Sequence, residues 1–154
     1  MNITFRQADI NDFEDVVKLY KQVIKTTFTT WDKDYPSKDM IKDDIQSNRL
    51  LVMLDDNKII GVAAVDDNKF IDEGEKIGGF ARICVSPDYQ HQGLGTKLVK
   101  YIIEKLKASG CKKIKLRVSI NNPAAIKMYE RCGFSRVGTD YNFELEWFLY
   151  ELVL

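Results

Sequence analysis

The segment from residue 78 to residue 108 constrains the fold more than any other part of the chain. An apolar run ends at Pro87, and a helical apolar pattern begins after Gly93 and Gly95. Proline has no backbone N–H to donate, so it ends the predicted strand. The later apolar positions recur at helical spacing and predict a helix with one broad buried face: Leu94, Leu98, Val99, Ile102, Ile103 and Leu106. The segment is therefore predicted to be a strand, a glycine loop and a helix.

The glycine loop has the residue types of an anion cradle. Backbone N–H groups at a helix N-terminus lack intrahelical partners, and the helix dipole adds partial positive charge there. Glycine lets an anion approach this backbone closely. A plain turn is the alternative, and the loop and helix alone do not distinguish the two. A dinucleotide fingerprint would need glycine where Leu98 stands, and a P-loop would need the opposite order of Thr96 and Lys97.

The rest of the chain predicts one mixed α/β domain over residues 1–154. The polar stretch 66–76 is interpreted as a loop. Helices are predicted after the caps at residues 9–12, after Ser37, after Gly93 and after Asn122. Strands are predicted at residues 3–7, 50–54, 58–65, 78–85 and 112–120, with two more in the tail 134–154 that join near 140–143. The order is β-α-α-β-β-β-α-β-α-β-β.

Charge and composition argue against several classes of protein. The chain has 23 basic and 23 acidic residues, so neither nucleic acid nor a membrane surface is an expected partner. No apolar run reaches the roughly 18 to 20 residues of a membrane span, and the N-terminus lacks a signal-peptide pattern. Three widely spaced cysteines and one histidine make neither a disulfide framework nor a metal site. We expect a reduced, cytoplasmic protein without a metal.

Two segments carry a further signal: ARICVSPDYQHQGLG at residues 81–95 and NPAAIKMYERCGF at residues 122–134. Together they resemble the GNAT family of acyl-CoA-dependent N-acetyltransferases. ARICVSPDYQHQGLG is similar to the family's fourth strand and its Q/R-x-x-G-x-G/A pyrophosphate loop. The segment from Asn122 to Phe134 is similar to the family's N-x-x-A-x-x-hydrophobic-Tyr-E-x-x-GF pattern, and the spacing between the two segments is the usual one. The resemblance implies a GNAT fold, in which a mixed, mostly antiparallel sheet of about seven strands is flanked by about four helices and splayed between strands four and five.

The resemblance also implies a site for acetyl-CoA. Asn122 would hold the cofactor arm, and Tyr129 would protonate the leaving thiolate. Each has a structural alternative, because Asn122 is also an N-cap and Tyr129 could be a core residue. The fourth strand would bind the pantetheine arm through its backbone at Ile83, Cys84 and Val85, as if the arm were an added strand. The loop would wrap the pyrophosphate with backbone N–H groups of Gln90, His91, Gln92, Gly93, Leu94, Gly95 and Thr96.

The function implied is transfer of an acetyl group from acetyl-CoA to a primary amine of a small molecule or peptide by direct attack. A general base is not obvious, because the central strands carry no suitable Asp or Glu. Glu75, Glu144, Glu146 and a water chain all remain candidates. The missing base favours an alternative, a non-catalytic acyl-CoA-binding or sensing domain. A third alternative is an interaction module in which the glycine loop is only a turn.

The acceptor pocket is expected in the loop from Phe28 to Pro36. Trp31 and Tyr35 would contact the acceptor there, or would pack as a lid on the core. Arg82 would pair with an acceptor carboxylate or with a structural Asp or Glu, and we prefer the structural pairing. Cys84 and Cys132 are interpreted as packing residues. The aromatic residues of the tail would form a homodimer interface or fill the core: Tyr141, Phe143, Trp147, Phe148 and Tyr150.

Overall fold

Seven strands form one hydrogen-bonded sheet in a computed structural model of the chain. The strand order is β1-β2-β3-β4-β5-β7-β6. The β4–β5 pair is parallel, whereas the β1–β2, β2–β3, β5–β7 and β6–β7 pairs are antiparallel. The structure describes residues 1–26 and 31–154, without the side chains of residues 26, 71 and 72. The first part of the expected acceptor loop, residues 28–30, lies outside the described residues.

The predicted order of elements is confirmed. The strands are β1 (Ile3–Gln7), β2 (Leu50–Asp55), β3 (Lys58–Asp72), β4 (Glu75–Val85), β5 (Lys113–Ser119), β6 (Ser135–Asn142) and β7 (Leu145–Val153). The helices are α1 (Phe13–Thr26), α2 (Lys38–Gln46), α3 (Leu94–Ala108) and α4 (Pro123–Arg131), with short 3-10 turns η1 (Ile10–Asp12) and η2 (Pro87–Tyr89). Among the described helices, none is long and apolar enough to cross a membrane.

The polar stretch 66–76 is not the loop that its composition predicted. β3 continues to Asp72, β4 begins at Glu75, and a two-residue turn joins them. Both turn residues, Glu73 and Gly74, have positive φ angles of 52° and 81°, as tight hairpins require. The prediction was wrong because polar side chains suit a strand whose faces meet water as well as they suit a loop. The β6–β7 turn likewise lies at residues 143 and 144, slightly later than expected.

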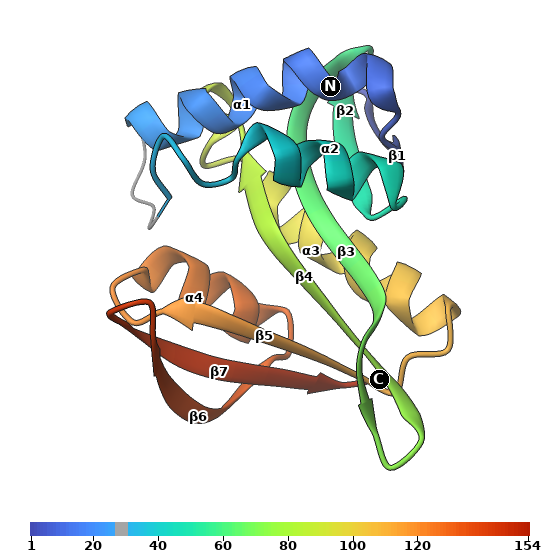
Figure 1. Ribbon diagram of the computed structural model, residues 1–154, viewed down its shortest axis with the longest axis vertical. Coiled ribbons are helices and arrows are strands. Elements are labelled where there is room, and N and C mark those ends of the chain that lie inside the picture. The colour runs from blue at the N-terminus through green and yellow to red at the C-terminus, as the bar shows by residue number, and fades with distance from the viewer. Residues whose placement is uncertain (27–30) are drawn as a thin grey trace. The chain divides into compact units, whose positions relative to one another are not determined.

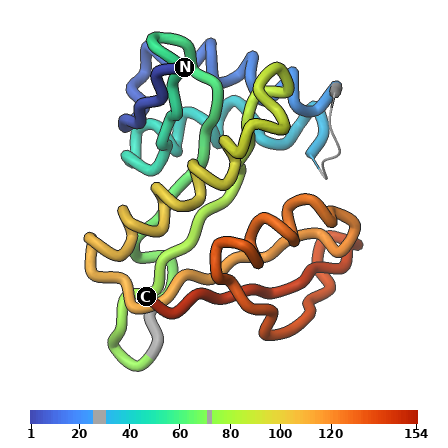
Figure 2. Tube along the Cα trace, turned by 180° about the vertical axis from the view of Figure 1, so that it is seen from behind, coloured from blue at the N-terminus to red at the C-terminus, as the bar shows by residue number. Residues whose placement is uncertain are grey.

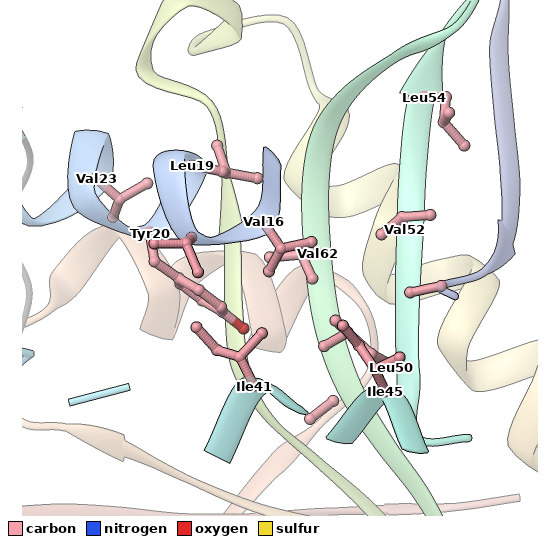
Figure 3. Packing of buried hydrophobic residues seen from close by; sticks show 13 residues of the cluster. Val16, Leu19, Tyr20, Val23, Ile41, Ile45, Leu50, Val52, Leu54 and Val62 are labelled. Atoms are coloured by element: carbon pink, nitrogen blue, oxygen red, sulfur yellow. The ribbon is translucent and has the colours of Figure 1, made fainter. Parts of the chain in front are cut away.

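The chain divides into two compact units. The first contains Met1–Val65 and Ala81–Gly95, and the second contains Asp66–Phe80 and Thr96–Leu154. In the first unit, α1 and α2 cover one face of strands β1 to β3 (Figure 1). Figure 3 shows the buried side chains that fill this layer, including Val16, Leu19, Tyr20, Val23, Ile41, Ile45, Leu50, Val52, Leu54 and Val62. Burial of each such apolar side chain contributes about 1.5–3 kcal/mol.

In the second unit, α3 and α4 cover one face of the strands (Figure 2). A Cβ on Gly78 would lie 3.0 Å from the side chain of Leu106 of α3, so the helix packs closely over this glycine. Two residues further along β4, the ring of Phe80 packs against Tyr129 of α4. Residues two apart in a strand point to the same face, so both helices meet the same side of β4.

The aromatic residues of the tail divide between core and surface. Tyr150 is fully buried, and its hydroxyl group donates to Glu130 at 3.1 Å. Tyr141 and Phe143 lie near the β6–β7 turn with exposed fractions of 70% and 71%. Core filling therefore accounts for Tyr150 and not for these two residues, and the homodimer stays a prediction.

Candidate functional site

The glycine loop exposes its backbone at the start of α3. Gln90, His91, Gln92 and Gly93 are all exposed, and α3 begins at Leu94. His91 and Gly93 have left-handed φ angles of 63° and 74°. Left-handed residues that alternate with ordinary ones turn successive N–H groups toward one concave, anion-binding side. A Cβ on Gly93 would meet no heavy atom within 4 Å, so the space beside it is open.

Hydrogen bonds fix the segment that precedes the loop. The hydroxyl group of Tyr89 donates to Asp55 at 3.1 Å, and this bond joins η2 to the end of β2. The N–H of Ser86 donates to the carbonyl of Ile60 in β3 at 2.7 Å. Gln90 donates from Nε2 to the carbonyl of Val85 at 3.2 Å. The loop is thus exposed, but its entry is held in one position.

The end of β4 directs the backbone of Ile83 and Val85 away from β3. The N–H of Ser86 faces β3, and the carbonyl of Cys84 lies 3.3 Å from a Cβ built on Gly61 of β3. Backbone groups of successive residues alternate between the two edges of a strand. Those of Ile83 and Val85 therefore point to the other edge. The ladder of β4 with β5 joins residues 77–79 to residues 113–115 and ends before Ile83.

Tyr129 is a buried phenol on α4. Its exposed fraction is 6%, and its ring centroid lies 6.0 Å from that of Phe80 and 5.9 Å from that of Phe134. Within the described residues, its hydroxyl group has no hydrogen-bond partner, yet no fully buried side-chain oxygen there lacks one. The hydroxyl oxygen must therefore reach the accessible surface. Burial raises the pKa of Tyr129 well above 10, so the phenol stays protonated at neutral pH.

Asn122 begins α4 as its predicted N-cap. Its Oδ1 accepts from the N–H of Ala125 at 3.2 Å, and Pro123 follows at the first helical position. Proline is favoured there because its missing N–H would have had no partner. The structural alternative for Asn122 is thus present, and contact with a cofactor stays a prediction.

Cys84 is a packing residue, and the same interpretation of Cys132 stays a prediction. Cys84 packs against the core of the first unit, and burial raises the pKa of its thiol. Burial also raises the pKa of Cys132, although Lys100 and Arg131 oppose this effect. A raised pKa keeps both groups as thiols at neutral pH, and the thiol is the unreactive form.

Arg82 forms a buried ion pair. The sequence predicted that Arg82 would pair with a structural Asp or Glu, but not which residue this is. Its Nε and Nη2 donate to Oδ2 and Oδ1 of Asp44 at 2.8 and 2.9 Å. Burial by itself would lower the pKa of Arg82. Its interactions with Asp44 and Tyr35 have the opposite and larger effect, so the pKa of Arg82 lies above its ordinary value. The preferred structural pairing is present, and contact of Arg82 with an acceptor stays a prediction.

Asp44 itself was not predicted from the sequence. The residue lies three positions after Ile41, on the apolar stripe of α2, and only 1% of it is exposed. An acid on an apolar helical stripe, together with an arginine in a central strand, was the available signal.

Trp31 and Tyr35 differ in exposure and in the residues that they contact. Trp31 is half-buried and packs edge-on against Tyr20, with ring centroids 5.4 Å apart. Tyr35 is exposed, and its hydroxyl oxygen lies 3.5 Å from Nη1 of Arg82. Trp31 therefore packs on the core as a lid would, while Tyr35 is accessible to a ligand.

The candidate bases all lie at the surface. Glu75 begins β4, Glu144 lies in the β6–β7 turn and Glu146 follows in β7, and each is exposed. The segment of β4 that reaches from residue 77 to residue 85 has no carboxylate, and β5 has none either. Among the described residues, no group of three or more His, Cys, Asp or Glu residues is placed to hold a metal ion.

A family model matches most of the chain. Residues 16–134 match the model described as the acetyltransferase (GNAT) family. This range contains both segments on which the resemblance was based.

Curated relatives match parts of the chain. N-alpha-acetyltransferase 30 of Schizosaccharomyces pombe is 33% identical over 95 residues, which cover 61% of this chain and 62% of the relative. The ribosomal protein bS18-alanine N-acetyltransferase of Escherichia coli K12 is 41% identical over 61 residues, which cover 40% of this chain and 41% of the relative. The matches therefore span less than two thirds of these relatives' length.

Solved structures match the whole chain. The PaiA N-acetyltransferase of Thermoplasma acidophilum in complex with coenzyme A has a TM-score of 0.82 at 23% identity, with 100% of both chains covered. The NatC complex bound to Gag peptide and CoA contains a chain with a TM-score of 0.81 at 22% identity, covering 100% of this chain and 99% of that one. At these identities the likeness shows the fold, and the predicted fold class is confirmed.

Proposed function

The chain belongs to the acetyltransferase (GNAT) family, and from this membership we propose that it transfers an acetyl group from acetyl-CoA to a primary amine. The observation that carries the proposal is the exposed backbone of the glycine loop, with its left-handed residues His91 and Gly93 before the first turn of α3. This loop lies within the residues that match the family model.

Acetyl-CoA would be held mainly by main-chain groups. The N–H groups from His91 to Thr96 would bind the diphosphate, which the dipole of α3 also attracts. The N–H of Gln90, which the sequence also predicted to bind it, already donates to the carbonyl of Pro87 at 3.5 Å. The backbone of Ile83 and Val85 points to the edge of β4 away from β3, and it would bind the pantetheine arm as a neighbouring strand would. Asn122 would add a contact to the same arm. Main-chain binding of this kind depends on the conformation of the loop and on accessible backbone N–H and C=O groups, more than on particular side chains.

The chemical step would be direct attack by the amine. The amine nitrogen forms a bond to the carbonyl carbon of the thioester, and the N–H of Val85 stabilises the resulting oxyanion. The carbon–sulfur bond then breaks, and the thiolate takes a proton from Tyr129. Burial keeps Tyr129 protonated at neutral pH, so the phenol has a proton to give. The proton lost by the amine goes to solvent or to an exposed carboxylate, and Tyr129 regains a proton from solvent after the thiol leaves.

The acceptor we favour is the α-amino group of a peptide. A lysine-like amine with a pKa of about 10.4 requires about 4.6 kcal/mol for deprotonation at pH 7, whereas an α-amino group with a pKa near 8 requires about 1 kcal/mol. The second cost is small enough to need no dedicated base, and β5 and residues 77–85 of β4 carry no carboxylate. The names of the two curated relatives, an N-alpha-acetyltransferase and a ribosomal protein alanine N-acetyltransferase, support the same choice.

A panel of amines tests the proposal. Thiol release from acetyl-CoA would be measured with a peptide that has a free N-terminus, with the same peptide blocked at its N-terminus but carrying lysine, and with a polyamine. We expect the free N-terminus to give the highest kcat/KM at pH 7. Faster reaction of the blocked peptide or the polyamine would contradict the acceptor, and absence of thiol release with every amine would contradict the enzyme.

A non-catalytic acyl-CoA-binding domain is the second candidate. The lack of a carboxylate on β5 and on residues 77–85 of β4 favours it. Calorimetry with coenzyme A separates the candidates when it is combined with the amine panel. Binding without turnover would support the sensing domain, and absence of binding at millimolar coenzyme A would contradict both.

A further inference from the structure

Arg82 has an unusual backbone conformation for a residue within a strand. Its φ angle is +52°, in the left-handed region. Residues with a Cβ avoid this region because the Cβ crowds the following carbonyl oxygen, so the conformation persists only where the surroundings hold it. A left-handed residue in a strand changes the direction of the backbone that follows, as in a β-bulge. Here the residues that follow are Ile83 to Val85.

Two groups of the first unit hold Arg82, one at its backbone carbonyl and one at its guanidinium group. The hydroxyl group of Tyr20 donates to the backbone carbonyl of Arg82 at 2.7 Å. Burial raises the pKa of Tyr20, which keeps this hydroxyl a donor. At the other end, the two oxygens of Asp44 accept from the guanidinium group at 2.8 and 2.9 Å. Bidentate pairs of this kind fix both distance and orientation.

Asp44 can hold Arg82 firmly because its own position is fixed. Its side chain is 2% exposed and also accepts from Arg49, whose Nη2 lies 3.2 Å from Oδ1. Arg49 in turn pairs with Asp43 at 2.6 Å, so two cations face two carboxylates. Asp43 is the contrasting neighbour, because its side chain is 69% exposed and its ion pair is with Arg49.

We propose that Asp44 is a positioning residue for acetyl-CoA, acting through Arg82 on the backbone of Ile83 and Val85. The inference rests on the proposed function, because it assumes that these backbone groups bind the pantetheine arm. The carboxylate fixes the guanidinium group, Tyr20 fixes the carbonyl, and together they hold the left-handed turn that directs the peptide groups after it. Hydrogen bonds to a ligand need such groups placed to within about 0.5 Å.

The test compares Asp44→Asn with Asp43→Asn by calorimetry. Two ligands are used: coenzyme A, and 3′-phosphoadenosine 5′-diphosphate, which keeps the nucleotide and the diphosphate but lacks the pantetheine arm. We expect Asp44→Asn to weaken binding of coenzyme A by at least about tenfold. The truncated ligand should bind Asp44→Asn within about twofold of the unchanged protein, because the loop that would hold it is not altered. Asp43→Asn should leave both affinities unchanged.

The two ligands distinguish positioning from a general structural effect. Equal weakening of both ligands by Asp44→Asn, or no weakening of either, would contradict the positioning role. Failure of the unchanged protein to bind coenzyme A would overturn the proposed function, and the inference with it. Should Asp44→Asn fail to fold, Tyr20→Phe replaces it, since this variant removes only the hydroxyl group that holds the carbonyl of Arg82. The same split between the two ligands is expected, and its absence would overturn the inference.

Discussion

The glycine loop and helix α4 offer opposite kinds of chemistry. The loop presents exposed main chain, with four consecutive exposed residues from Gln90 to Gly93. Helix α4 presents one buried side chain, Tyr129, among aromatic rings. A backbone N–H is still present after most substitutions, but its direction depends on the backbone conformation. A side-chain hydroxyl group is removed when its residue is replaced. The proposed binding and acid roles should therefore respond to mutation in different ways.

Tyr129→Phe should give the largest effect. The variant keeps the ring and its packing against Phe80 but removes the proton that the thiolate would take. We expect kcat to fall about 10²- to 10⁴-fold, with little change in the affinity for coenzyme A. Steady-state kinetics and calorimetry measure the two quantities. An unchanged kcat would remove Tyr129 as the acid.

Arg82→Met should lower stability much more than Arg117→Met. Arg82 pairs with a carboxylate that is 2% exposed, and removing one partner of a buried pair costs about 3–5 kcal/mol, here at the lower end because Arg49 remains. Arg117 lies over Trp147 and 3.8 Å from Asp140, with 39% of its side chain exposed, so its loss should cost about 1 kcal/mol or less. Urea unfolding measures both. Equal costs would show that the two environments are equivalent.

Gly93→Ala should weaken cofactor binding without changing kcat. A Cβ would fit sterically, so the cost comes from the φ angle of 74° and is about 1–2 kcal/mol. Only molecules that hold the left-handed conformation would bind, so KM for acetyl-CoA should rise about 5- to 30-fold.

Gly74→Ala is the matched control for this substitution. Gly74 has a φ angle of 81° and equally open surroundings, but it lies in the β3–β4 turn. It should lose similar stability and keep the KM of the unchanged protein. A raised KM in Gly74→Ala would show that strain in general, and not the loop, limits binding.

The pH dependence should show the smallest effect. Burial raises the pKa of Tyr129, so the protonated phenol stabilises the folded state fully below the unfolded pKa of about 10, and this stability is lost as pH rises through the higher folded pKa. The acid therefore stays active through pH 10. We expect kcat to show no descending limb between pH 8 and pH 10. A limb with a midpoint near 10 would indicate an ordinary phenol as the acid.

Local features of the fold were predictable because their causes are local. The N-cap of Asn122 depends on a group three residues away, and the glycine loop was predicted from the residue types between Gln90 and Gly95. The strand from residue 66 to residue 72 was missed because its partner, and not its composition, makes it a strand.

The sequence by itself determined the order of elements, the family resemblance and the loop that would bind the diphosphate. Tertiary structure alone decided what holds the last residues of β4 in place. Asp44 and Tyr20 reach Arg82 from 38 and 62 positions away along the chain. Periodicity shows which face of a helix is buried, but not which buried residue meets which. The role of a carboxylate on an apolar stripe, such as Asp44, is therefore visible only when the fold brings an arginine into contact with it.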